Sequence, residues 1–234
     1  MRKCHTLMLL AVLAAGCASS PDKSLQSGFL PDYSQLKERD CAEKTITGEA
    51  RAPGTCFTWA TPSLAPHSFN AIILERLAFF PEPKPTEYVS QETLDRIRNY
   101  VDKKMREEIW KHITLVNTPG PGVVRMRWAI TAASADTRSL KFYQYIPVAL
   151  VVTAATAAVQ GGLPKDAKVA FETEITDSLT RQPIWLTLRT GTGERIKAVA
   201  SGEKKLDPDH LKKLFDAWSE DGATAMAYYF KPKQ

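Results

Sequence analysis

The chain has 234 residues and a formal net charge of +5, and 44% of its residues are hydrophobic and 24% are charged. This composition excludes a disordered tail or a fibre, and the length predicts one globular domain or two small ones. Arg2 and Lys3 lie in a segment that we expect to be removed, so the 31 basic residues become 29, against 26 acidic ones. The resulting net charge of +3 is too weak to indicate nucleic-acid binding.

The N-terminus has the pattern of a secretory signal. Two basic residues precede an apolar stretch, Leu7 to Ala15, which is too short for a membrane-spanning helix of about 20 residues. Small residues then lead directly to Cys17, in an arrangement that resembles the lipobox of bacterial lipoproteins. The resemblance implies cleavage after Gly16, diacylglycerol on the Cys17 thiol and acylation of the new amino terminus. An ordinary signal peptide with a chance cysteine is the alternative.

The residue after Cys17 indicates a destination. It is Ala18 and not Asp, which by the sorting rule of enterobacterial lipoproteins implies the outer membrane. We therefore expect residues 1–16 to be a lipoprotein signal peptide and 17–26 to be the lipidated cysteine and a polar tether. Residues 27–234 would form a single α+β domain, held by the lipid on the inner leaflet of the outer membrane and facing the periplasm.

Two further cysteines, Cys41 and Cys56, remain in the mature chain. In an oxidising compartment they predict one disulfide, which would stabilise the fold by about 3 kcal/mol. Two free thiols or a metal site are the alternatives, but there is no CxxC spacing and the nearest histidine is His67. Because Gly48, Pro53 and Gly54 lie between the cysteines, we expect that loop to be irregular.

Three segments carry a resemblance to a known family. The segment Ser27 to Leu36 reads Ser-Gly-Phe-Leu-Pro-Asp-Tyr-Ser-Gln-Leu, within an expected irregular strap at 25–36, and two further landmarks are the basic strand 124–131 and the acidic stretch 172–178. Over roughly residues 17–230 the chain resembles bacterial lipoproteins grouped as domain of unknown function 3313. The resemblance implies envelope localisation and an α+β domain, and it implies no activity. The chain departs from the family's usual turn at 180–183.

The middle of the chain predicts a strand, a helix and a second strand. The apolar, β-branched run 70–79 indicates a strand that prolines end. Ser90 can cap a helix to about His112, and strand 123–131 alternates apolar residues with Arg125 and Arg127. The helix has its apolar stripe at Leu94, Ile97, Val101, Met105 and Ile109.

The C-terminal part predicts an apolar segment at 146–159, a β-hairpin at 168–176 and 184–190, and a final helix that begins at Asp207. The buried stripe of that helix is expected at Leu211, Leu214, Phe215, Trp218 and Ala225. Because strand–helix–strand units are usually parallel and the hairpin must be antiparallel, we expect a mixed four-stranded sheet. Two long helices would pack on one face of it, in an α+β fold preceded by the irregular strap.

Three carboxylates form the first candidate site. Glu172 and Glu174 lie two positions apart on a strand and share a face, and Asp177 follows them. Such a group can hold a hard cation or divide into an acid and a base. The alternative is a solvent-exposed sheet face on which the acids pair with arginines of neighbouring strands. The candidate partners are Arg125, Arg127 and Arg189.

Other motifs predict no chemistry. The three histidines of the mature chain, His67, His112 and His210, have no ligand spacing, and Gly191-Thr192-Gly193 lacks the third glycine of a dinucleotide site. We find no catalytic motif and expect no metal and no cofactor. Five aromatic residues form a candidate binding patch or else pack in the core: Trp110, Tyr143, Tyr145, Tyr228 and Tyr229.

The first hypothesis for function is a non-enzymatic accessory lipoprotein of the cell envelope, which binds an envelope protein. The second is an enzyme acting on a cell-envelope polymer, with Glu172, Glu174 or Asp177 as acid or base. The third is a carrier of small apolar ligands, with a pocket near residues 146–159.

Overall fold

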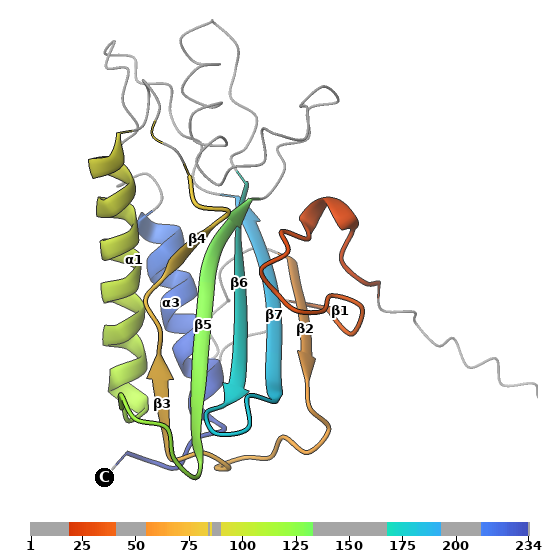
Figure 1. The fold of residues 1–234 in the computed structure, drawn as a ribbon, viewed down its shortest axis with the longest axis vertical. Coiled ribbons are helices and arrows are strands. Elements are labelled where there is room, and N and C mark those ends of the chain that lie inside the picture. The colour runs from red at the N-terminus through yellow and green to blue at the C-terminus, as the bar shows by residue number, and fades with distance from the viewer. Residues whose placement is uncertain are drawn as a thin grey trace, which may run out of the picture.

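The computed structural model describes residues 19–40, 55–83, 85, 90–132, 168–192 and 212–233. The elements are η1 (Lys23–Leu25), β1 (Lys37–Asp40), β2 (Thr55–Ala60), β3 (Ala71–Leu74), β4 (Ala78–Phe80), α1 (Gln91–His112), β5 (Val123–Ala132), β6 (Lys168–Asp177), β7 (Pro183–Thr192) and α3 (Lys212–Ala227). Within these residues the strands form a mixed sheet, against which helices α1 and α3 lie (Figure 1). Within these ranges, no helix combines the length and the apolar character needed to cross a membrane.

The α+β prediction is confirmed, but the sheet has seven strands and not four. Its order is β1-β2-β7-β6-β5-β3, and β4 also pairs with β5. The predicted strand–helix–strand unit is present, because β3 and β5 flank α1 and pair in parallel. The predicted hairpin is also present, since β6 pairs antiparallel with β7 and with β5.

Two of the additional strands come from the N-terminal part of the chain. Strand β2 continues the antiparallel sheet beyond β7, and its Phe57 is buried. Strand β1 is the edge strand beside β2 and consists of four charged residues, Lys37 to Asp40. A strand with no apolar residue gives no hydrophobic periodicity, so pairing with β2 and not the sequence pattern defines it.

The strand predicted at 70–79 is interrupted. Leu74 pairs with Met126, and Ala78 pairs with Ala129. Between these two pairs, three residues of the segment lie opposite only two residues of β5, so the pairing is interrupted there. In the interruption Leu77 turns into the core, and its N–H donates to the Asp102 carboxylate of α1 at 2.8 Å. The segment is therefore two short strands, β3 and β4, joined by an irregular residue triplet.

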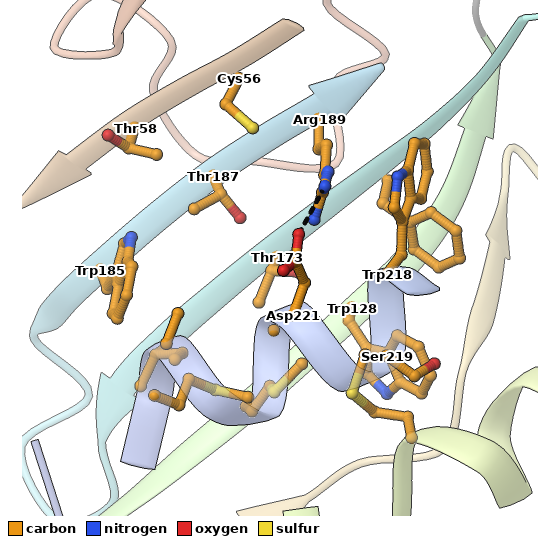
Figure 2. A pocket seen from close by; sticks show the side chains of 17 residues that line it. Cys56, Thr58, Trp128, Thr173, Trp185, Thr187, Arg189, Trp218, Ser219 and Asp221 are labelled. Carbon is orange, nitrogen blue, oxygen red and sulfur yellow. Dashed lines mark hydrogen bonds and ion pairs between the residues drawn. The ribbon is translucent and has the colours of Figure 1, made fainter. Parts of the chain in front are cut away.

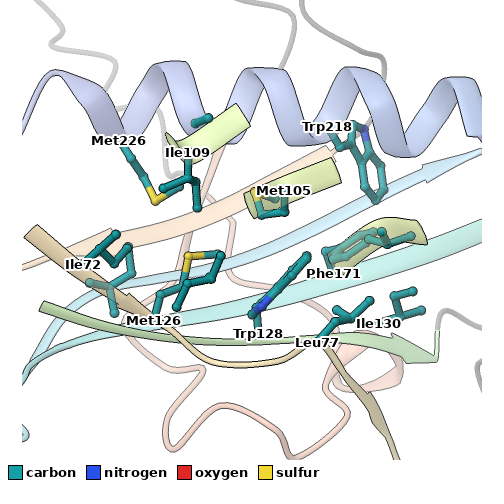
Figure 3. Close-up of a cluster of buried hydrophobic side chains, with 14 of the residues drawn as sticks. Ile72, Leu77, Met105, Ile109, Met126, Trp128, Ile130, Phe171, Trp218 and Met226 are labelled. Carbon is teal, nitrogen blue, oxygen red and sulfur yellow. The ribbon is translucent and has the colours of Figure 1, made fainter. Parts of the chain in front are cut away.

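Helices α1 and α3 pack against each other and cover one face of the sheet (Figures 1 and 3). The side chain of Ser90 accepts a hydrogen bond from the Thr93 N–H at 3.1 Å and so caps α1 as predicted. In the core between helices and sheet, the Phe171 ring stacks on Trp128 and meets Trp218 edge-on, with centroids 6.0 and 5.2 Å apart. The predicted stripe of α1 is buried in this core: Leu94, Ile97, Val101, Met105 and Ile109.

The strap, residues 25–36, covers part of the opposite face of the sheet. Its Phe29 meets Phe80 edge-on, with centroids 5.7 Å apart. A second core therefore forms on this face, from Phe29, Leu30, Leu36, Phe57, Ala129, Leu186 and Leu188. The parts of β5, β6 and β7 that lie beneath the strap are therefore covered on both sides.

Some predicted segments lie outside the described residues, namely 146–159 and the start of the last helix at Asp207. Within α3, Phe215 and Trp218 are buried as predicted, whereas Ala225 is only half-buried.

Candidate functional site: a buried polar network and an apolar pocket

Glu172 is fully buried on the strap side of β6 and contacts the strap through Tyr33. The Tyr33 hydroxyl donates to the Glu172 carboxylate and accepts from the N–H groups of Gly28 and Leu30, at 2.9 and 3.3 Å. Burial, together with the hydrogen bond to Glu172, raises the pKa of Tyr33, so the phenol stays protonated at neutral pH. One phenol oxygen therefore ties the backbone of the strap to a strand of the sheet.

Glu174 is the second acid under the strap. It pairs with Arg127, its direct neighbour on β5, so this predicted cross-strand pair is confirmed. The Arg127 guanidinium also donates to the Phe29 carbonyl of the strap at 2.6 Å and lies 4.4 Å from the centroid of the Phe29 ring. This ion pair therefore fixes the strap a second time, by a hydrogen bond and a cation–π contact.

The interpretation of Glu172 and Glu174 as part of a solvent-exposed sheet face is wrong. That face is covered by the strap, and Glu172 and Glu174 are buried. Asp177 is separate from both, because it ends β6 and accepts from the N–H groups of Leu179 and Thr180 at 3.0 and 2.7 Å. These hydrogen bonds, chiefly the one from Thr180, hold the pKa of Asp177 below its ordinary value. The three acids therefore form a strap contact and a turn and do not converge on one site.

Arg189 does not pair with these acids. It is opposite Phe171 in the register and so lies on the helix face of the sheet. There its guanidinium donates to the Asp221 carboxylate of α3 at 2.8 Å and lies 5.0 Å from the centroid of the Trp218 ring. Both partners of this pair are largely buried, and they connect β7 to α3.

Beside this ion pair the structure has a pocket of about 160 Å³, shown in Figure 2. It lies between α3 and the helix face of the sheet, and its side chains come from β2, β5, β6, β7, α1 and α3. The apolar part of the lining consists mainly of aromatic and methionine side chains, which are Met105, Met126, Trp128, Phe171, Trp185, Trp218 and Met226.

Three threonines form a polar row on the sheet side of the pocket. Thr173 of β6 pairs with Thr187 of β7, which in turn pairs with Thr58 of β2. Each threonine hydroxyl can both donate and accept a hydrogen bond. The buried indole N–H of Trp218 has no hydrogen-bond partner among the described residues. The pocket therefore combines an apolar wall with hydroxyl and indole groups that can hydrogen-bond a ligand.

The histidines and the aromatic patch singled out in the sequence lie only partly within the described residues. The Nδ1 atom of His67 lies 2.8 Å from the Phe230 carbonyl, and no cluster of three or more metal-binding side chains occurs in the described ranges. Of the aromatic patch, Trp110 and Tyr228 are exposed, and Tyr229 packs on Trp185. Several predicted residues lie outside the described part of the chain: Cys17, Cys41, Tyr143, Tyr145 and His210.

The disulfide between Cys41 and Cys56 stays a prediction, although the strand pairing favours it. Asp40, the residue before Cys41, pairs with Thr55, and Thr55 precedes Cys56. Sequence reasoning missed the pocket, because only the pairing of three strands brings Thr58, Thr173 and Thr187 into one row.

Comparisons with known proteins agree with the resemblance seen in the sequence. Residues 25–221 match the model of a family described as "Protein of unknown function (DUF3313)". The chain is 34% identical over 210 residues to the uncharacterised lipoprotein YdcL of Escherichia coli strain K12 and to that of strain O157:H7, covering 88% of each chain. A PelC dodecamer from Paraburkholderia phytofirmans is similar at 12% identity with a TM-score of 0.37, covering 78% of this chain and 100% of that one. The family match and the curated relatives show that the chain belongs to this family of bacterial lipoproteins of unknown function.

Proposed function

We propose that the protein is a lipid-anchored accessory protein of the cell envelope. The lipid on Cys17 would hold it on the inner leaflet of the outer membrane, where its domain binds an envelope protein. The observation that carries this proposal is that the first described residues after Cys17 already contact the sheet. The Glu38 N–H of β1 donates to the Ser19 carbonyl at 2.9 Å, and the Lys37 ammonium donates to the Ser20 hydroxyl at 3.2 Å.

The anchor and the domain are therefore close together. Only Ala18 separates Cys17 from Ser19, and two residues span at most about 7 Å. Three acyl chains hold a protein stably, whereas a single chain gives only weak binding. A domain tied this closely would lie against the membrane with the β1 edge of its sheet and would search for partners along the surface.

A face for the partner is suggested by exposed apolar side chains. Trp110, Leu179 and Tyr228 are 61%, 57% and 51% exposed and are the large hydrophobic residues that the described part of the chain leaves open. They come from the C-terminal ends of α1 and α3 and from the turn between β6 and β7, which lie at the same end of the molecule in Figure 1.

The test is photo-crosslinking in living cells, with the crosslinking residue placed at Trp110 or at Tyr228. Lys103, an exposed position in the middle of α1, is the matched control. We expect one dominant envelope protein to be captured from the two apolar positions, only weakly from Lys103, and not in a Cys17→Ser variant. Equal capture from Lys103, or undiminished capture without the anchor, would contradict the proposal.

A further inference from the structure

The pocket between α3 and the sheet has the size of a small-molecule site. Its volume of about 160 Å³ compares with the engineered cavity of about 150 Å³ that binds benzene. Methionine side chains at its wall adapt to the shape of a ligand, and aromatic rings supply flat apolar surface. The apolar body of a ligand would therefore be about one aromatic ring in size.

The hydrogen-bonding groups of the pocket define the polar end of the ligand. Thr187 stands at the centre of the threonine row, and its hydroxyl can donate or accept. Trp218 offers a buried N–H, which can only donate. A hydroxyl or carbonyl group on the ligand would use these groups, because it can accept from either of them.

The charge of the site selects against an ionic ligand. Arg189 and Asp221 neutralise each other, and their side chains are only 16% and 7% exposed. A carboxylate brought into the pocket would remain a buried charge without a counter-charge, or would have to displace Asp221 from the guanidinium. Either course costs free energy that a neutral ligand avoids.

We propose that this pocket binds a small uncharged amphipathic molecule, with one aromatic ring or a similarly compact apolar body and one hydrogen-bond-accepting group. The inference goes beyond the envelope role proposed above and depends neither on the anchor nor on a protein partner. It gives the third hypothesis, the apolar-ligand carrier, a site among described residues in place of the segment 146–159.

Three probes with the same ring test the proposal: benzyl alcohol, toluene and benzoate. The protein used is residues 17–234 with Cys17→Ser, so that no lipid is attached. Binding is followed by the indole N–H resonances of the five tryptophans, with Trp218 assigned from a Trp218→Phe variant and Trp110 as the distant reference. We expect benzyl alcohol to shift the Trp218 resonance and to bind about 10-fold or more tightly than benzoate.

Two variants locate the polar contact and the ring. Thr187→Val should weaken benzyl alcohol about 2- to 10-fold, the worth of one hydrogen bond, and leave toluene unchanged. Thr190→Val, on the same strand but outside the pocket, is the matched control. Ala225→Phe, which places a ring against the pocket wall, should abolish binding of benzyl alcohol and toluene.

Three results would overturn the inference. They are benzoate binding as tightly as benzyl alcohol, equal effects of Thr187→Val and Thr190→Val on benzyl alcohol, or no shift of Trp218 with any probe. Because the anchor is absent and no partner is added, these failures leave the proposed envelope role untouched.

Discussion

At the scale of single residues, Tyr33 is the centre of the contact between strap and sheet. Its hydroxyl accepts from two strap N–H groups and donates to Glu172, which is fully buried. Gly28, whose N–H is one of the two donors, has a φ of 91°, a backbone conformation that residues other than glycine rarely adopt. The Gly28 and Tyr33 positions of the sequence motif thus have a structural reason: they close the strap over two buried acids.

Replacing Tyr33 by Phe should destabilise the protein by about 2–3 kcal/mol, because the buried Glu172 carboxylate and two N–H groups lose their partner. Urea unfolding at neutral pH measures this change. Tyr228→Phe, at an exposed position, is the control and should change the free energy of unfolding by less than about 0.5 kcal/mol. Equal stabilities of the two variants would show that the Tyr33 hydroxyl does not hold the strap.

Asp177 predicts a dependence of stability on pH. Its pKa is lower in the folded protein than in the unfolded chain, so its ionised form stabilises the fold above about pH 4. That contribution is lost as the pH falls through the folded pKa. Asp177→Asn should therefore be less stable than the parent protein at pH 7, and the difference should shrink below pH 4. A difference in unfolding free energy that stays constant from pH 7 to pH 3 would contradict this role.

At the scale of elements, helices and strands with a strong hydrophobic periodicity could be predicted from the sequence. The apolar stripe of α1, its cap at Ser90 and the alternation of β5 all appear in the structure as expected. Strand β2 carries a weaker signal of this kind in Phe57 and Trp59, which sequence reasoning passed over. Strand β1 has none, because its four residues are charged.

The acidic site could not be placed from the sequence for a different reason. Alternation on β6 correctly separates Phe171 from Glu172, but it cannot say what covers each face. The strap that buries Glu172 lies 139 residues away in the chain, so the contact is tertiary. Likewise, the sequence does not say that Arg127 and Arg189 lie on opposite faces of the sheet. The strand register decides this, because it places Arg127 opposite Glu174 and Arg189 opposite Phe171.

The pairing of β1 with β2 gives an expectation for how a disulfide between Cys41 and Cys56 would affect stability. If Cys41 and Cys56 are bonded, the bridge closes the loop that joins these two strands. A Cys41→Ser variant should then be destabilised by about 3 kcal/mol, and a reducing agent should lower the stability of the parent protein similarly. Thiol titration of the unfolded protein is the direct check. Two titratable thiols in protein isolated from the envelope would refute the bond.

At the scale of the whole molecule, the two faces of the sheet and its β1 edge differ in what covers them. The pocket lies between α3 and the helix face of the sheet, the strap covers part of the opposite face, and the β1 edge contacts Ser19 and Ser20, which follow Cys17 closely. At another end of the molecule, Trp110 and Tyr228 are exposed. Such an arrangement would keep both the pocket and the partner face within a short distance of the membrane.

The lipid anchor can be tested directly by the mass of the N-terminal peptide of the protein isolated from bacterial outer membranes. We expect a peptide that begins at Cys17 and carries the mass of a diacylglycerol and one further acyl chain. An N-terminus at another residue, or an unmodified Cys17, would contradict the lipid anchor and with it the placement of the domain at the membrane.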